Sequence, residues 1–120
     1  MANIQQSSKA KLQIVLNYGN VPIKVFGDII GSRYVNDRVE FFYHPSGKDV
    51  MVTPGKDMPL NMSEVNIPTN VDHLLIDARL WHGSQQIIGG SYSFGIGEPG
   101  KSDQHTISGN NTNLFILYFS

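Results

Sequence analysis

Apolar and polar residues alternate with a period of two over much of this chain. Between residues 12 and 18 the apolar side chains stand at every second position, at Leu12, Ile14, Leu16 and Tyr18. Further strand-like runs follow, each closed by glycine or proline. Runs 21–30, 39–44 and 50–53 are rich in β-branched or aromatic residues, run 60–67 alternates weakly, and the glycine-containing run 87–96 fits a bulged strand. A period of two sends successive side chains to opposite faces of a strand, so the pattern predicts β-strands.

Residues 70–82 fit two kinds of element. A helix would have Thr69 as its N-cap and would end before Gly83, which stands where a helix-terminating glycine belongs. A strand would instead place one apolar row on a single face, made of Leu74, Ile76, Ala78 and Leu80. We favour the strand because every neighbouring run is strand-like, and we keep a single helix over residues 70–82 as the alternative.

The end of the chain is apolar at every position from Leu114 to Phe119. A strand of this composition needs cover on both faces. The run therefore predicts the central strand of a packed sheet or, alternatively, part of a subunit contact, where aromatic and apolar residues gather.

Together these runs predict an all-β fold: an antiparallel β-sandwich, jelly-roll-like, of about eight strands. A length of 120 residues suits one domain. We expect a polar N-terminal lead-in over residues 1–10 and a single β-sandwich domain over residues 11–120. The predicted core consists of Leu12, Ile14, Leu16, Ile23, Val25, Val39, Phe41, Leu74, Ile76, Leu80, Phe94, Leu114, Ile116 and Tyr118.

Charge and composition narrow the classes of partner. Charged residues make up only 16% of the chain, the net charge is −1, and no cluster of Lys and Arg stands out. Nucleic-acid binding therefore has no electrostatic support. A weakly charged surface repels copies of itself little, so we expect a homo-oligomer.

The same composition bears on membranes and compartment. No apolar run approaches the 18 residues of a transmembrane helix, so no transmembrane segment is expected. The polar start of the chain shows no secretory signal. The compartment stays open between the cytoplasm and release without a visible signal.

A search for catalytic and metal-binding patterns yields none. The chain has no cysteine, no Gly-x-Ser-x-Gly elbow and no His-Glu-x-x-His motif, and its four histidines are scattered. We therefore expect no catalytic residues, no metal site and no cofactor, and interpret the protein as non-enzymatic.

One constellation points to binding. On a strand, Asp77, Arg79 and Trp81 project from the same face, and Tyr92 and Tyr43 could extend it. An aromatic ring offers a platform for the C–H face of a sugar, while Asp accepts and Arg donates hydrogen bonds to hydroxyls. The sequence therefore predicts a lectin-like module that binds a glycan or a similar polar surface ligand. The plainer alternative is an outer-face ion pair beside a tryptophan that caps the core.

Two other functions fit the same sequence. The low charge and the apolar last strand would suit a structural, self-assembling β-sandwich subunit of a capsid, tail or fibre. The order of strand, polar loop and apolar strand over residues 74–90 would suit a C2-like membrane-docking module. The loops of this chain, however, lack the clustered acidic residues that would bind calcium.

Overall fold

A computed structural model describes residues 8–120, and over this range the protein is an all-β sandwich. Nine strands form two antiparallel sheets, and the described residues contain no helix, so the predicted fold class is confirmed. No helix in this part of the chain is long and apolar enough to cross a membrane. The strands are β1 (Ser8–Asn17), β2 (Ile23–Ser32), β3 (Val39–His44), β4 (Val50–Val52), β5 (Glu64–Ile67), β6 (His73–His82), β7 (Gln85–Gly95), β8 (Ser102–Gly109) and β9 (Thr112–Phe119).

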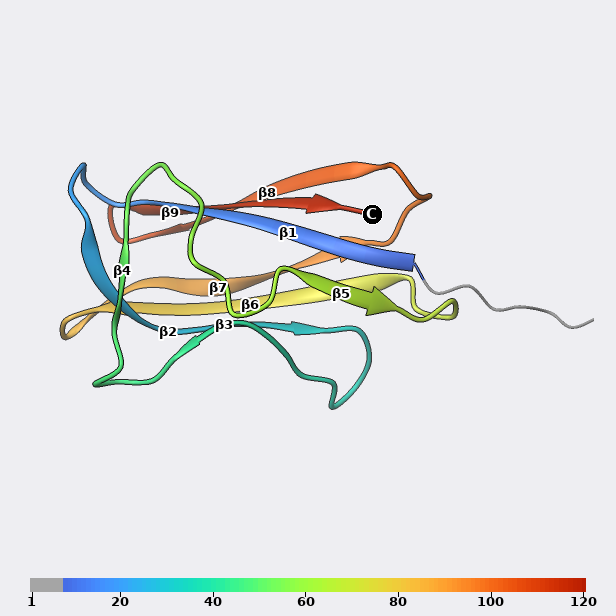
Figure 1. The fold of residues 1–120 in the computed structure, drawn as a ribbon, viewed down its shortest axis with the longest axis horizontal. Coiled ribbons are helices and arrows are strands. Elements are labelled where there is room, and N and C mark those ends of the chain that lie inside the picture. The colour runs from blue at the N-terminus through green and yellow to red at the C-terminus, as the bar shows by residue number, and fades with distance from the viewer. Residues whose placement is uncertain (1–7) are drawn as a thin grey trace, which may run out of the picture.

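The two sheets lie face to face (Figure 1). One has the order β5-β1-β9-β8, and the other has the order β3-β2-β6-β7 with β4 paired to β2. We call them the four-stranded and the five-stranded sheet. Both are antiparallel throughout, so each strand can bury one face and expose the other.

The core fills the space between the sheets. Every one of the fourteen predicted core residues is buried, from Leu12 in β1 to Tyr118 in β9. In β1 and β9 the pairing of Ile14 with Ile116 sets two fully buried side chains side by side. The period-two alternation therefore identified the inward faces of these strands correctly.

Residues 70–82 do not form a helix. Most of this segment is β6, a ten-residue strand that pairs with β2 on one edge and β7 on the other. Leu74, Ile76, Ala78 and Leu80 are all fully buried on its inward face. The helix alternative was wrong because only a strand puts all four of these side chains into the core while satisfying the backbone through both neighbours.

The start of the sandwich and one of its strands differ from the sequence-based expectation. β1 begins at Ser8, and its first residues pair with β5, so Ser8 to Ala10 belong to the sandwich and not to the polar lead-in. The rest of that lead-in lies outside the described residues. β8 was not anticipated, because Ile107 is its only buried residue and its other side chains are polar.

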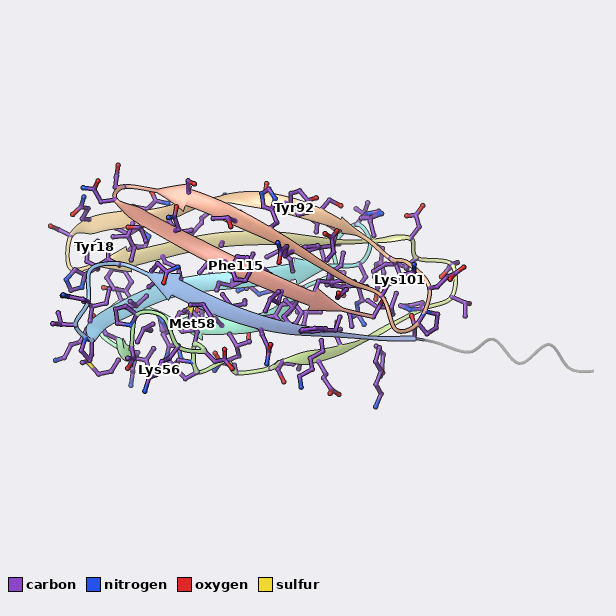
Figure 2. The ribbon with its side chains drawn as sticks, turned by 90° about the horizontal axis from the view of Figure 1, so that it is seen from above. Tyr18, Lys56, Met58, Tyr92, Lys101 and Phe115 are labelled. Carbon is purple, nitrogen blue, oxygen red and sulfur yellow. The ribbon has the colours of Figure 1, made fainter. Side chains whose placement is uncertain are left out.

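The C-terminal run, β9, is a central strand between β1 and β8. Leu114, Ile116 and Tyr118 face the core, but Phe115 and Leu117 are half-buried on the outer face and Phe119 is 37% exposed. Figure 2 looks onto this sheet, with Phe115 near the middle of β9. The sequence predicted that both faces of this strand would be covered, but within this chain only its inner face is fully buried.

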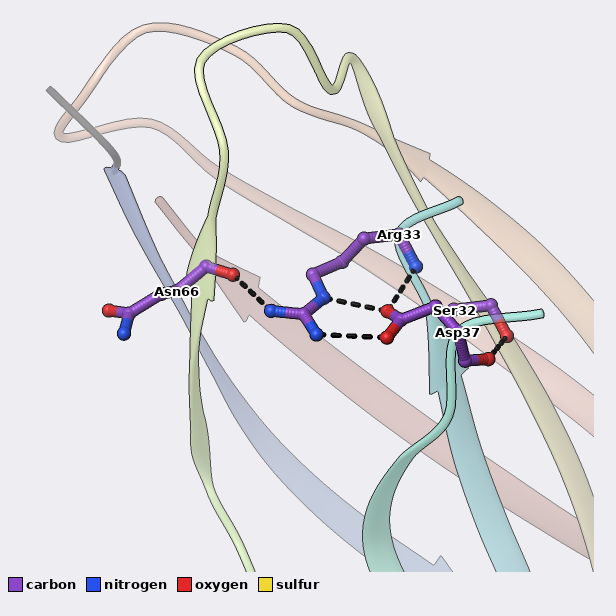
Figure 3. Close-up of polar contacts among 4 residues, drawn as sticks. All are labelled: Ser32, Arg33, Asp37 and Asn66. Atoms are coloured by element: carbon purple, nitrogen blue, oxygen red, sulfur yellow. Dashed lines mark hydrogen bonds and ion pairs between the residues drawn. The ribbon is translucent and has the colours of Figure 1, made fainter. Parts of the chain in front are cut away.

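An arginine clasp joins the two sheets at one end of the sandwich (Figure 3). Arg33 follows β2 and donates two hydrogen bonds to the Asp37 carboxylate, from Nε at 2.7 Å and from Nη2 at 2.9 Å. Its Nη1 donates to the backbone oxygen of Asn66 in β5 of the other sheet, at 2.7 Å. This hydrogen-bonded arginine lowers the pKa of Asp37 to about 2.

Candidate functional site

The outer face of the five-stranded sheet carries most of the predicted site. Asp77, Arg79 and Trp81 alternate along β6 with side chains of the core, so all three project outward. The register with β2 sets Phe26 beside Trp81 and Asp28 beside Arg79. The face is thus built from pairs of residues on two adjacent central strands.

A hollow of about 400 Å³ lies at one end of this face. We call it the aromatic hollow, and its principal lining residues are Phe26, Asp28, Tyr43, Arg79, Trp81 and Gln86. Three of the five predicted site residues, Tyr43, Arg79 and Trp81, therefore line one depression.

A bend in β2 forms the base of the aromatic hollow. Val25 pairs with β4, whereas Gly27 pairs with β3, so the strand changes partners within two residues. Figure 1 shows β2 turning at this point. Gly27 has a φ of 127°, and a Cβ there would lie 2.1 Å from the backbone oxygen of Arg79. Only glycine permits both this backbone angle and this close approach.

Aromatic rings supply the apolar part of the hollow. The rings of Phe26 and Trp81 are nearly parallel, with 10° between their planes and 6.1 Å between their centroids. Tyr43 is 41% exposed, and the guanidinium of Arg38 lies 5.7 Å from its ring centroid. The rings are partly buried, so their positions are held by the sheet, and they are partly exposed to solvent. A ligand can therefore reach their exposed surface from water.

Charged groups of both signs stand beside these rings. Burial raises the pKa of Asp28, and the nearby carboxylate of Asp77 acts in the same direction, while Arg38 and Arg79 oppose the rise. The charged form of a partly desolvated carboxyl lacks some of its hydrogen bonds to water. A ligand that donates hydrogen bonds to this carboxylate would stabilise it.

The ion pair between Asp77 and Arg79 is loose. Arg79 Nε and Asp77 Oδ2 are 3.6 Å apart, and both side chains are substantially exposed. This distance is too long for a hydrogen bond, and exposed pairs contribute little to stability. The outer-face ion pair beside Trp81, which was the alternative interpretation, is therefore present. It is too weak to prevent the guanidinium of Arg79 from donating hydrogen bonds to a ligand.

Tyr92 does not belong to this face. It pairs with Ile76 in the register of β6 and β7, which puts it on the inward side of the sheet. Its ring stacks on His105 of β8 with centroids 3.6 Å apart. Tyr92 therefore helps to close the edge between the two sheets and does not extend the Asp77–Trp81 face.

Sequence reasoning missed Phe26 and Asp28. Both lie in the run 21–30, whose β-branched residues were recognised, and both alternate with its core residues. Their alternation with the core residues is a signal that could have placed them on the outer face, but the pairing of β2 with β6 depends on the three-dimensional topology. That pairing is what sets them beside Arg79 and Trp81.

The described residues contain no cluster of potential metal ligands. Among residues 8–120, no three His, Cys, Asp or Glu side chains gather closely enough to hold a metal ion. His73 and Asp77 both lie on β6, where a spacing of four does not bring side chains together as it would on a helix. The side chains that line the aromatic hollow supply hydrogen-bond donors, hydrogen-bond acceptors and aromatic rings.

Comparison with known proteins gives no relative from which to transfer a function. No family model, no curated protein and no solved structure matches this chain.

Proposed function

We propose that this protein is a non-enzymatic, lectin-like module that binds a carbohydrate in the aromatic hollow. The observation that supports this most is the convergence of Trp81, Arg79, Tyr43 and Asp28 on one depression of the five-stranded sheet. Ligand sites combine apolar surface with a few convergent polar groups, and this hollow has both.

Each group has a role in the proposed binding. The C–H face of a pyranose ring packs on Trp81, which Phe26 supports from the neighbouring strand. The guanidinium of Arg79 donates to ring or hydroxyl oxygens, and the carboxylate of Asp28 accepts from hydroxyl groups. Because both strands are central in the sheet, these groups are held on a rigid support.

The test is a glycan array followed by titration of tryptophan fluorescence. Trp81 is the sole tryptophan, so its emission reports on this hollow alone. Trp81→Ala should abolish binding on the array. The matched control is Tyr34→Ala, which removes an exposed aromatic from the loop after β2 and should leave binding intact. Absence of any array signal, or equal binding by the Trp81 variant, would contradict the proposal.

A second candidate, a self-associating subunit, is favoured by the outer face of the four-stranded sheet. Phe115, Leu117 and Phe119 form an apolar stripe along β9, and Val15 of β1 pairs with Phe115. Lys11 pairs with Phe119 at one end of the stripe, and Asp57 bridges to Val15 at the other. Two copies stacked with opposed strand directions would set Lys11 of each near Asp57 of the other, with the apolar stripes between them.

Sedimentation equilibrium distinguishes this role. A dimer that becomes monomeric on Leu117→Lys supports the self-associating stripe. Met51→Lys serves as the control, because Met51 is 52% exposed on β4 of the other sheet and should leave the dimer unchanged. A wild-type protein that stays monomeric at high concentration would exclude this role without affecting the carbohydrate proposal.

A further inference from the structure

A second hollow continues the first along the same face. It has a volume of about 340 Å³, and we call it the polar hollow; its lining includes Ile30, Ser32, Arg38, Leu75 and Asp77. Asp28 and Arg79 line both hollows. The aromatic and polar hollows therefore form one trough, with this pair of residues at the junction.

The trough runs along β2 and β6. Its outward pairs follow in order from Phe26 with Trp81 at one end to Ser32 with Leu75 at the other. The six residue steps from Phe26 to Ser32 span roughly 20 Å, a length that suits roughly three or four linked pyranose rings. A single sugar on Trp81 would leave the polar hollow empty.

Charges along the trough nearly balance. Asp28, Asp77 and Glu40 supply three carboxylates, and Arg38 and Arg79 supply two guanidinium groups. Arg38 is hydrogen-bonded to Glu40 through Nη2 at 3.0 Å, so its charge is partly compensated before any ligand arrives. An anionic ligand would meet more carboxylates than arginines, whereas uncharged hydroxyl groups can bond to donors and acceptors alike.

We infer that the ligand is an uncharged, linear oligosaccharide that lies along β2 and β6, with one sugar on Trp81 and further units in the polar hollow. This inference rests on the proposed function and adds the length, the direction and the charge of the ligand. Asp28 and Arg79 bind the unit at the junction, and Leu75 packs against the distant end.

Isothermal titration with four size series of uncharged sugars tests the inference. The probes are the cello-, malto-, manno- and N-acetylchito-oligosaccharides, each from one to six units. In at least one series the affinity should rise by roughly three- to tenfold per added unit up to the third or fourth, then level off. Leu75→Ala should weaken binding of the tetramer several-fold and leave the monosaccharide unchanged, whereas Tyr34→Ala should change neither.

The outcomes separate this inference from the proposed function. A monosaccharide that binds as tightly as its tetramer would overturn the extended trough, yet leave carbohydrate binding at Trp81 standing. Tighter binding of an acidic oligosaccharide, such as oligogalacturonate of equal length, would overturn the uncharged ligand. Binding to none of the four series would overturn the inference, and the glycan array would then decide on carbohydrate binding alone.

Discussion

Gly27 lies against the backbone of Arg79, so close that a Cβ on Gly27 would meet the Arg79 oxygen at 2.1 Å. This approach joins the bend of β2 to the strand that carries Arg79 and Trp81. The shape of the aromatic hollow therefore depends on a residue with no side chain.

The first prediction concerns this contact. Gly27→Ala should lower the free energy of unfolding by roughly 2–4 kcal/mol, because it combines an unfavourable φ with a collision against backbone that cannot move aside. Gly19→Ala is the control, since Gly19 also has a positive φ but has no atom within 4 Å of an added Cβ. Urea unfolding should show the larger loss at Gly27; equal losses would mean that the close approach is unimportant.

The second prediction concerns Asp28. Because burial raises its pKa in the folded protein, the ionised carboxyl costs stability, and that cost appears as the pH rises through the folded pKa. Asp28→Asn should therefore raise the free energy of unfolding at pH 7 and leave it unchanged at pH 3. The same substitution should weaken carbohydrate binding by roughly tenfold, the worth of a hydrogen bond to a charged group.

A matched variant separates this effect from a general change of charge. Asp49 is exposed in the loop between β3 and β4, and Asp49→Asn should alter neither stability nor binding appreciably. If Asp28→Asn instead lowered the free energy of unfolding at pH 7, the ionised carboxylate of Asp28 would not destabilise the folded protein, and the prediction would be wrong.

The third prediction concerns the arginine clasp. The pKa of Asp37 is lowered to about 2, so its contribution to stability is complete above the ordinary carboxyl pKa and is lost as the pH falls through about 2. Asp37→Asn should cost about 2 kcal/mol at pH 7, because it weakens the charged hydrogen bonds that hold Arg33 in place. Arg33 in turn donates to Asn66 of the other sheet. Urea unfolding from pH 7 to pH 2 should show the two proteins converging at the acid end; a constant difference would argue against the clasp.

The fourth prediction compares two neighbours in β9. Ile116 is fully buried between the sheets, and Ile116→Ala should cost about 2–5 kcal/mol. Leu117 lies half-buried on the outer face, and in the monomer Leu117→Ala should cost about 1 kcal/mol or less. Chemical denaturation of monomeric protein should separate them clearly, and similar costs would show that the outer face of β9 is covered.

The inward faces of the strands could be predicted from sequence because burial follows a local rule. Leu74, Ile76 and Leu80 stand two or four residues apart, and alternation alone was enough to assign them to the core. β8 escaped prediction because an edge strand with Ile107 as its sole buried residue has too little alternation to be detected.

The candidate site was predictable only in part. Asp77, Arg79 and Trp81 lie on one strand, so their common face followed from spacing. Phe26 and Asp28 join them through the register between β2 and β6, which pairs residues about fifty positions apart and cannot be read from either strand alone. Tyr92 was misplaced for the same reason, since its face depends on the register of β7 against β6.

Amide chemical-shift mapping by NMR tests the carbohydrate proposal most directly. The ¹⁵N-labelled protein is titrated with the tightest-binding uncharged sugar from the array. The predicted result is a set of shifts confined to residues 26–32, 75–81 and Tyr43, on the outer face of the five-stranded sheet. Shifts that gather on β9 and β1 instead, or their absence at saturating sugar, would contradict the account.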